Sequence, residues 1–443
     1  MTRLAASAVR SLGAAGGPDG LASVELAIRT AMHRLGGALL EELLSLDPGH
    51  RGPRVECGHG HRAAFVGYRG KRLDTVLGPV TVRRAWYQCP SCGGGLAPRD
   101  TELGVASASL SPGLRRMVAR VGARSPFAQA RRDLAELAGI ELTAKRVERS
   151  AEADGEMVRA TSEATASAVL AGRVVPFAPA GPLERLYVAL DGTGVPTVPR
   201  DTAGRRGKGP DGRARTREVK LGCLFTGTSV DERGQPVRDP GSSGYVATLG
   251  TAERFGSLVY AEARRRGAGR AEQLVVLGDG APWIWGLAGE HFPGAIEIVD
   301  LYHAREHVHA LGALVAPALG DEQRGWLTER LAELDRGDVA TLLVAVRELR
   351  LPDAQAKEVE KALGYFETNA GRMRYARFRA LGLFVGSGAV EAGCRAVVAQ
   401  RLKLSGMRWT VRGAAAIVSL RCEDASGRWD EVWKWLNTQT SAA

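Results

Sequence analysis

Two stretches of the chain, Leu186-Tyr-Val-Ala-Leu-Asp191 and Leu274-Val-Val-Leu-Gly-Asp279, each place an acidic residue at the end of an apolar run. Short apolar runs of this kind predict buried strands. A third acidic residue, Glu391, follows Gly386-Ser-Gly-Ala-Val390 at the expected start of a helix. Mg²⁺ prefers carboxylate oxygens, and two such ions can hold the attacking and leaving oxygens of a phosphoryl transfer. The pattern predicts a metal site built from Asp191, Asp279 and Glu391.

The elements expected around these residues form a mixed α/β sheet. Strands are predicted at 186–190, 219–226, 244–248, 273–277 and 295–299, with helices at 251–266, 282–291 and 302–316. Three strands followed by alternating helices and strands is the order of the RNase H-like fold. Its first and fourth strands are neighbours, so Asp191 and Asp279 are expected to meet at one edge.

The rest of the C-terminal part is expected to be helical. Residues 319–384 show helical periodicity and no strand pattern, which predicts an insertion. It separates the first part of the catalytic core, 183–318, from C-terminal helices at 385–443. A helix at 389–402 carries Glu391 back to the site.

A small module with cysteines and histidines is expected at 51–105. A Cys-x-x-Cys pair with further ligands about thirty residues upstream is zinc-ribbon spacing, and zinc accepts sulfur and nitrogen ligands together. Spacing does not choose between the two histidines, and the alternative is free thiols with surface histidines. Strands are expected at 62–68, 73–77 and 80–87. The candidate zinc ligands are Cys57, His59, His61, Cys89 and Cys92.

Between this module and the core, residues 106–172 are predicted to be helical. One helix ends at Gly139, and Thr143 can cap a second helix that carries Lys145, Arg146 and Arg149. This is a helix-turn-helix outline, whose second helix would enter the major groove of DNA. The alternative is an ordinary helical hairpin. Residues 1–50 are expected to hold one helix, at 21–45, after a disordered start over Met1–Gly17.

The charge balance favours a partner that carries phosphates. The chain of 443 residues has 60 Lys+Arg against 49 Asp+Glu, a net charge of +11. No apolar run is long enough to cross a membrane, and six cysteines do not form a secreted disulfide framework, so a cytoplasmic location is expected. Arg205, Arg206 and Lys208 lie in a Gly-rich loop, for which two interpretations stand, a loop that binds phosphates and a solvated, flexible segment. Further DNA-binding candidates are Arg205, Arg206, Lys208, Arg395, Arg401, Lys403 and Arg408.

Several motifs together resemble one family. Over about 50–425 the chain is similar to ISKra-type insertion-sequence transposases. The motifs that carry the resemblance are Asp191-Gly-Thr-Gly-Val-Pro196, Arg217-Glu-Val-Lys-Leu-Gly222, Asp279-Gly-Ala-Pro-Trp-Ile-Trp285, Phe292-Pro-Gly-Ala-Ile-Glu-Ile-Val-Asp300-Leu-Tyr-His303-Ala-Arg-Glu-His307 and Gly386-Ser-Gly-Ala-Val-Glu391.

The resemblance implies a DDE-type transposase with an RNase H-like core. Asp191, Asp279 and Glu391 match the catalytic positions, while Asp300 and His303 match an accessory Asp-x-x-His signature. Two Mg²⁺ or Mn²⁺ ions, about 3.5–4 Å apart, are the implied cofactors. The implied partners are the terminal inverted repeats of the transposon and the target DNA. Joining two DNA ends implies a homodimer or larger complex in a prokaryotic cytoplasm, at the nucleoid.

Two other functions remain in view. A domesticated, non-catalytic DNA-binding regulator would keep DNA binding and lack cleavage. A junction resolvase would use a similar core, but the zinc module, the helix-turn-helix outline and the helical insertion exceed what that reaction needs. A requirement for specific terminal sequences separates a transposase from a resolvase.

Overall fold

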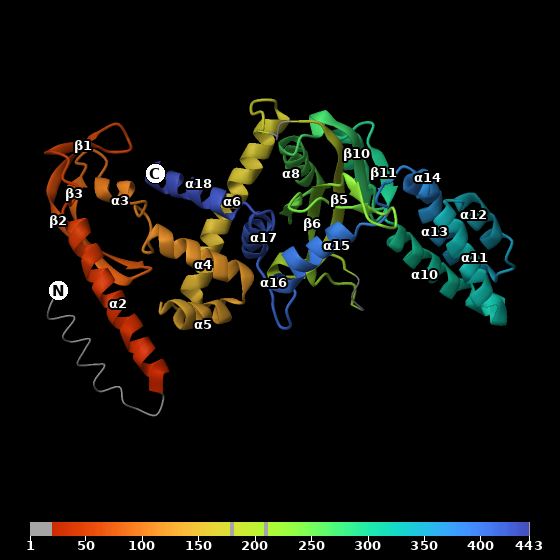
Figure 1. The fold of residues 1–443 in the computed structure, drawn as a ribbon, viewed down its shortest axis with the longest axis horizontal. Helices are drawn as coiled ribbons and strands as arrows, with labels where there is room; N and C mark the ends of the chain where they lie inside the picture. Colours follow the sequence, from red (N-terminus) through yellow and green to blue (C-terminus); the bar gives the residue numbers. More distant parts are fainter. Residues whose placement is uncertain (1–19, 178–180, 208–210, 443) are drawn as a thin grey trace. The chain divides into compact units, whose positions relative to one another are not determined.

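The computed structural model describes residues 20–177, 181–207 and 211–442 (Figure 1). The expectations for Met1–Gly17 and for Lys208 therefore lie outside the described residues. The chain divides into two compact units. The first extends to Val158 and also contains the segment from Arg428 onward, and the second is Arg159–Gly427. Among the helices that the structure describes, none has both the length and the apolar character of a membrane span.

The first unit contains a small antiparallel sheet in the order β1-β2-β3-β4. Its strands are β1 (Arg54–Glu56), β2 (Arg62–Thr75), β3 (Gly78–Gln88) and β4 (Gly95–Leu96). The two strands predicted at 62–68 and 73–77 are one continuous strand, β2, which corrects the prediction. A bulge between Phe65 and Gly67 shifts the register there, and the positive φ of Gly67, +132°, accommodates it. Residues 69–72 all pair with β3, so the strand continues through the residues that separated the two predicted strands.

Helices complete the first unit. They are α2 (Gly20–Ser45), α3 (Pro98–Glu102), α4 (Pro112–Arg124), α5 (Phe127–Ala138), the first part of α6 (Ala144–Leu170) and α18 (Trp429–Ala442). Leu40 and Leu44 of α2 pack against a buried cluster of the sheet that includes Leu73, Val80 and Val82. This apolar contact holds α2 on the sheet.

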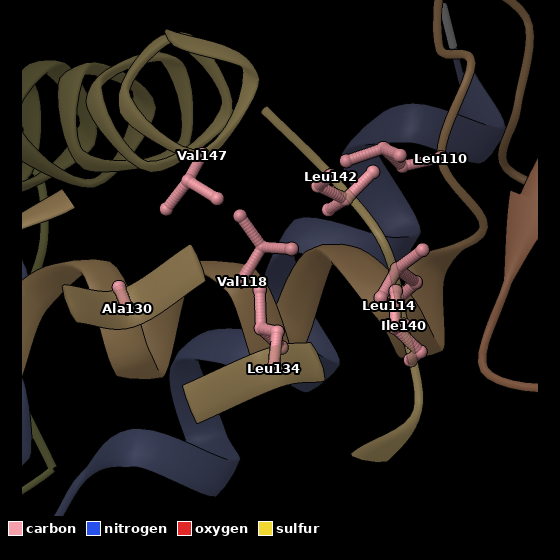
Figure 2. Close-up of a cluster of buried hydrophobic side chains, with 8 residues drawn as sticks. All are labelled: Leu110, Leu114, Val118, Ala130, Leu134, Ile140, Leu142 and Val147. Carbon is pink, nitrogen blue, oxygen red and sulfur yellow. The ribbon is translucent and has the colours of Figure 1, made fainter. Parts of the chain in front are cut away.

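A second apolar core joins α4, α5 and the start of α6. Figure 2 shows Val118, Leu134 and Val147, one from each helix, directed toward one another within a cluster of buried side chains. Gly139 ends α5 in the left-handed conformation, at φ +64°. The hydroxyl of Thr143 accepts a hydrogen bond from the backbone N–H of Arg146 at 3.2 Å, which caps α6. Both helix boundaries follow the sequence signals.

The second unit is built on a five-stranded mixed sheet in the order β11-β10-β5-β6-β9. The strands are β5 (Leu183–Pro196), β6 (Thr216–Thr226), β9 (Gly244–Thr248), β10 (Ala271–Gly278) and β11 (Ile296–Val299). β10 runs parallel to β5 and β11, while β6 is antiparallel to both β5 and β9. The predicted mixed α/β sheet is confirmed. A separate two-stranded ribbon pairs β7 (Ser229–Val230) with β8 (Pro236–Val237).

The centre of this sheet is buried on both faces. Residues Leu186–Leu190 of β5 all have zero exposure. The elements that accompany the sheet are α7 (Pro199–Thr202), α8 (Ala252–Arg265), the 3₁₀ turn η1 (Ala268–Arg270), α9 (Pro282–His291) and α10 (Leu301–Leu319). The continuous apolar run that predicted a buried strand is thus explained, because both faces of β5 lie in the core.

The remaining helices of the second unit follow α10. They are η2 (Gly320–Glu322), α11 (Gln323–Arg336), α12 (Val339–Arg347), α13 (Asp353–Asn369), η3 (Ala370–Arg372), α14 (Tyr375–Ala380), α15 (Gly388–Gly393), a π-helical segment η4 (Cys394–Ala399), α16 (Gln400–Leu402) and α17 (Val411–Ala425). The prediction kept 385–443 together, whereas the structure assigns the part from Arg428 onward to the first unit.

Candidate active site and metal groups

Asp191 and Asp279 lie at the same level of two neighbouring strands. Ala189 of β5 is the register partner of Leu277 of β10, and the strands are parallel. Each aspartate is two residues further along its own chain. Both carboxylates are therefore brought to one end of the β5–β10 pair.

Asp191 is partly buried and hydrogen-bonded on both oxygens. Its Oδ1 accepts from the backbone N–H of Gly192 at 2.6 Å, and its Oδ2 accepts from the Cys394 thiol at 3.2 Å. Burial raises the pKa of Asp191 above its usual value, although the hydrogen bonds from Cys394 and Gly192 oppose the rise. The negative charge of Asp279 raises it further, while His303 acts in the opposite direction. The carboxylate is thus poised to gain from a nearby cation.

Asp279 is fixed by the turn that follows β10. Its Oδ1 accepts from the backbone N–H of Ala281 at 2.9 Å, and the hydroxyl of Tyr365, on α13, donates to its carbonyl oxygen at 3.0 Å. Gly280 between them has φ +99°, and a Cβ there would come within 2.7 Å of the Tyr365 ring. The helical segment after α10 therefore contacts the backbone of a candidate metal ligand.

Asp300 connects two segments that are distant in sequence. It has zero exposure and caps α10, because its Oδ1 accepts from the backbone N–H of His303 at 2.7 Å. Its Oδ2 accepts from the backbone N–H of Ser387, whose hydroxyl donates to Glu391 Oε1 at 3.0 Å. Asp300 thereby holds the segment that positions Glu391.

The structure groups Glu391 most closely with the accessory pair. One ligand atom from each of Asp300, His303 and Glu391 lies within 4.8 Å of the other two, a set of donors that suits a divalent cation. Within the described part of the chain, Asp191 and Asp279 do not belong to this group. Asp191 is nevertheless linked to the segment that carries Glu391, because Cys394, three residues after Glu391, donates to Asp191 Oδ2.

Three contacts of this site were not predicted from sequence. Cys394 lies one helical turn after Glu391, and Ser387 lies one turn before it, so helical spacing from Glu391 points to both. Tyr365 is 86 residues from Asp279 in sequence, and no local pattern indicates that contact.

The second group of metal-ligating residues is in the first unit. Ligand atoms of Cys57, His61, Cys89 and Cys92 all lie within 4.8 Å of one another. The Cys57 sulfur is 3.7 Å from that of Cys89 and 3.8 Å from that of Cys92. Zinc–sulfur bonds of about 2.3 Å in a tetrahedron separate two sulfurs by about 3.8 Å. The four residues therefore fit a structural zinc ion, and the structure favours His61 over His59.

The backbone around these cysteines forms two tight turns. The backbone N–H of Cys57 donates to the carbonyl of His61 at 2.8 Å, and that of Cys89 donates to the carbonyl of Gly94 at 2.8 Å. The backbone N–H of Cys92 lowers the pKa of the Cys89 thiol, which favours the thiolate form that binds metals.

The predicted DNA-binding residues fall into different environments. Arg401 is fully buried, with its guanidinium 4.8 Å from the Trp409 ring centre, so its predicted contact with DNA is wrong. Arg146 pairs with Asp74 at 2.5 Å and is half-buried, which ties α6 to β2. Lys145 pairs with Glu148 at 2.6 Å but stays exposed. The exposed candidates are Lys145, Arg149, Arg205, Arg206, Arg395, Lys403 and Arg408.

Three of these exposed arginines share one groove of the second unit. Arg205, Arg206 and Arg408 line a groove of about 960 Å³ together with Arg213 and Arg215. Lys403 contacts the hydroxyl of Thr193 on β5, close in sequence to Asp191. Positive charge is therefore concentrated beside the extended end of β5.

No family model matches this chain, and no curated protein matches it either.

Proposed function

We propose that the second unit is an RNase H-like catalytic core and that the protein is the DDE transposase of an insertion sequence. Support comes from the strand order β11-β10-β5-β6-β9, with three antiparallel strands and two further parallel ones. The observation that carries the proposal is that Asp191 and Asp279 lie at one end of neighbouring parallel strands, while the segment around Glu391 is hydrogen-bonded to Asp191 through Cys394 and to Asp300 through Ser387. The helical stretch α11–α14 would be the insertion that precedes the glutamate.

In this proposal Asp191, Asp279 and Glu391 hold two divalent cations. When bound, such ions generate a nucleophile from water or a 3′-hydroxyl and stabilise the leaving oxygen. Cys394 and Gly192 keep the Asp191 carboxylate in place, and Ser387 does the same for Glu391. His303 orients the scissile phosphate from the first turn of α10.

The first unit would bind and position the DNA. Cys57, His61, Cys89 and Cys92 would hold a structural zinc ion in a zinc-ribbon-like module. The α5–turn–α6 segment would act as a helix-turn-helix, with exposed Lys145 and Arg149 toward DNA. The partners would be the terminal inverted repeats and target DNA, and the joining of two ends requires a homodimer or larger complex.

The test is cleavage of DNA that flanks the gene, in the presence of Mg²⁺ or Mn²⁺. We expect specific nicking or strand transfer at the element ends by the wild type and none by Asp191→Asn. The exposed arginine variant Arg350→Ala serves as a control that should cut normally. Binding of the ends without cutting in any variant would instead support a non-catalytic regulator.

A further inference from the structure

A pocket of about 410 Å³ opens in the second unit beside the group formed by Asp300, His303 and Glu391. Pockets that hold small molecules usually have about 300–1,000 Å³, so this one suits a single nucleotide-sized group and not a duplex. It lies between the start of α10, the ribbon β7–β8, α14 and the segment that leads into α15. The sequence did not predict a pocket here, although Tyr302, Gly386 and Ala389 belong to quoted motifs.

The floor of the pocket is apolar and firmly packed. Phe225 and Leu383 are each 1% exposed. Phe384 meets Phe225 edge to face at 5.5 Å between ring centres, and meets Tyr187 in the same way at 5.1 Å. A floor made of interlocked rings keeps its shape and offers an apolar surface to a flat ligand.

One wall is an exposed aromatic ring. Tyr302, the second residue of α10, is 60% exposed and lines the pocket. A Cβ on Gly386 would lie 2.9 Å from the Tyr302 ring, so the ring packs closely over that glycine. The backbone N–H of Leu301 donates to the carbonyl of Val385 at 2.9 Å and fixes this arrangement. Tyr302 is therefore held in place, while the exposed part of its ring can still contact a ligand.

The rim of the pocket carries positive charge. Arg238 and Arg379 both line it and are exposed, and Gln235 adds an amide side chain. Arg379 donates one hydrogen bond to the carbonyl of Asp335 at 2.9 Å, which anchors the side chain from α14. Two guanidinium groups around an apolar floor suit a ligand with an aromatic body and an anionic backbone.

The pocket adjoins the candidate metal ligands. Gly388, Ala389 and Ala392 line it from the helix that carries Glu391. Tyr302 lies between Asp300 and His303 in sequence. A strand bound with its phosphate at the candidate metal site would therefore place a neighbouring nucleotide beside this pocket.

We propose that this pocket receives an unpaired nucleobase of the DNA strand held at the site, stacked on Tyr302, with Arg238 and Arg379 at the adjacent phosphates. The inference rests on the proposed action on DNA. The pocket has room for one base only, so a base that is still paired and stacked in a duplex cannot enter. The base must first leave the stack. The pocket thus selects a strand end or an opened base pair.

Photocrosslinking tests the occupant directly. The probe is a single-stranded oligothymidylate in which 5-iodouracil replaces some of the thymines, and irradiation is followed by peptide mapping. We expect an adduct on the peptide that contains Tyr302. The same oligonucleotide annealed to its complement should give far less of this adduct.

Matched variants separate the pocket from general DNA binding. Tyr302→Ala and the pocket-filling Ala389→Phe should each weaken single-strand binding about 10-fold or more, with duplex binding little changed. Arg379→Ala should weaken single-strand binding as well. Two control variants, Arg377→Ala and Ala376→Phe, change exposed residues of α14, the helix that carries Arg379. Neither residue lines the pocket, so both variants should bind as the wild type does.

The outcomes distinguish the pocket from the proposed function. Metal-dependent nicking by the wild type, with no adduct at Tyr302 and equal single-strand affinity in all variants, overturns the pocket alone. Absence of both DNA binding and nicking overturns the transposase proposal and the pocket with it. An adduct at Tyr302 that Ala389→Phe abolishes, together with retained duplex binding, supports the inference.

Discussion

At the scale of single residues, two of the carboxylates are held by hydrogen bonds that the sequence motifs did not predict. Cys394 donates to Asp191 across 3.2 Å, and Ser387 donates to Glu391 across 3.0 Å. The thiol is buried, and both burial and the charge of Asp191 raise the pKa of Cys394, so it stays protonated and remains a donor. Its role is to hold Asp191 and not to react.

The prediction for Cys394 follows from this hydrogen bond. Cys394→Ala removes the donor, and we expect metal affinity or the cleavage rate to fall about 10- to 100-fold. Cys394→Ser keeps a donor at the same place and should retain most of the activity. Calorimetric Mn²⁺ binding and the cleavage rate measure the two effects. Equal values for alanine and wild type would show that the hydrogen bond has no such role.

Residue roles could be predicted where a local pattern decides them. The positions of Asp191 and Asp279 could be predicted because a buried apolar run stops at each, but β5 continues to Pro196, so the prediction that Asp191 ends its strand is wrong. Spacing did not separate His59 from His61, since only the fold of the turn at Cys57 shows which imidazole faces the sulfurs. Arg401 looked like a DNA ligand within a basic run, but its partner ring, Trp409, lies on a segment that returns against it. Burial of this kind depends on tertiary packing.

His291 gives a pH prediction at the same scale. Burial lowers the pKa of this histidine below 6.5, although the nearby Glu290 opposes the shift, and Tyr260 and Phe292 are its ring neighbours. The unfolded chain therefore binds the proton more tightly than the folded chain. This contribution leaves stability unchanged well above pH 6.5 and lowers it as the pH falls through that value.

The measurement is the melting temperature as a function of pH. The drop between about pH 7.5 and about pH 5.5 should be smaller in His291→Gln than in the wild type. His309→Gln, which changes an exposed histidine of α10, should follow the wild type. An unchanged slope in His291→Gln would mean that this histidine is not kept neutral by the fold.

At the scale of elements, a glycine in the turn after β10 allows α13 to pack closely against that turn. Gly280 has φ +99°, and Tyr365 from α13 lies against it. Gly280→Ala should destabilise the fold by about 1–3 kcal/mol from backbone strain alone, and the close contact with Tyr365 should add to that loss. Cleavage should fall as well, because Asp279 immediately precedes this turn.

Gly286→Ala is the matched control for that change. Gly286 lies inside α9, and a Cβ there would meet no atom within 4 Å. Alanine at this position should be neutral or stabilise by up to about 1 kcal/mol. Urea unfolding of both variants compares the two free energies. Similar values for the two variants would refute the constraint assigned to Gly280.

Element boundaries could be predicted better than element geometry. The predicted strand 244–248 and helix 282–291 coincide with β9 and α9, because Gly and Pro mark their ends. The helix predicted at 389–402 instead contains the π-helical segment Cys394–Ala399 directly after α15. Apolar periodicity does not reveal a π segment, because it inserts one residue into a turn without changing the composition. Such segments often occur at functional sites.

At the scale of the whole molecule, the chain divides into two compact units, and it returns to the first unit after the second, which was not predicted. The segment from Arg428 onward belongs to the first unit, where the Arg120 guanidinium lies 5.1 Å from the Trp429 ring centre and Trp433 is 2% exposed. Nothing local in this helix indicates its partner, since Arg120 lies more than three hundred residues earlier. Long-range return of a terminal helix is therefore invisible to patterns of period and spacing.

The division into units also predicts that zinc binding acts on only one of them. If Cys57, His61, Cys89 and Cys92 hold zinc, chelation should remove a stabilisation that the small sheet β1–β4 needs, because a module of this size buries few apolar side chains. Hydrogen exchange read by mass spectrometry should then show lost protection in β2 and β3 and unchanged protection in β5 and β10. His61→Ala should lower the amount of zinc bound per chain and reproduce this loss of protection, whereas His59→Ala should bind zinc as the wild type does. A full complement of zinc in His61→Ala would contradict the assignment of His61 as the fourth ligand. A loss of protection that extends to β5 would contradict the independence of the two units.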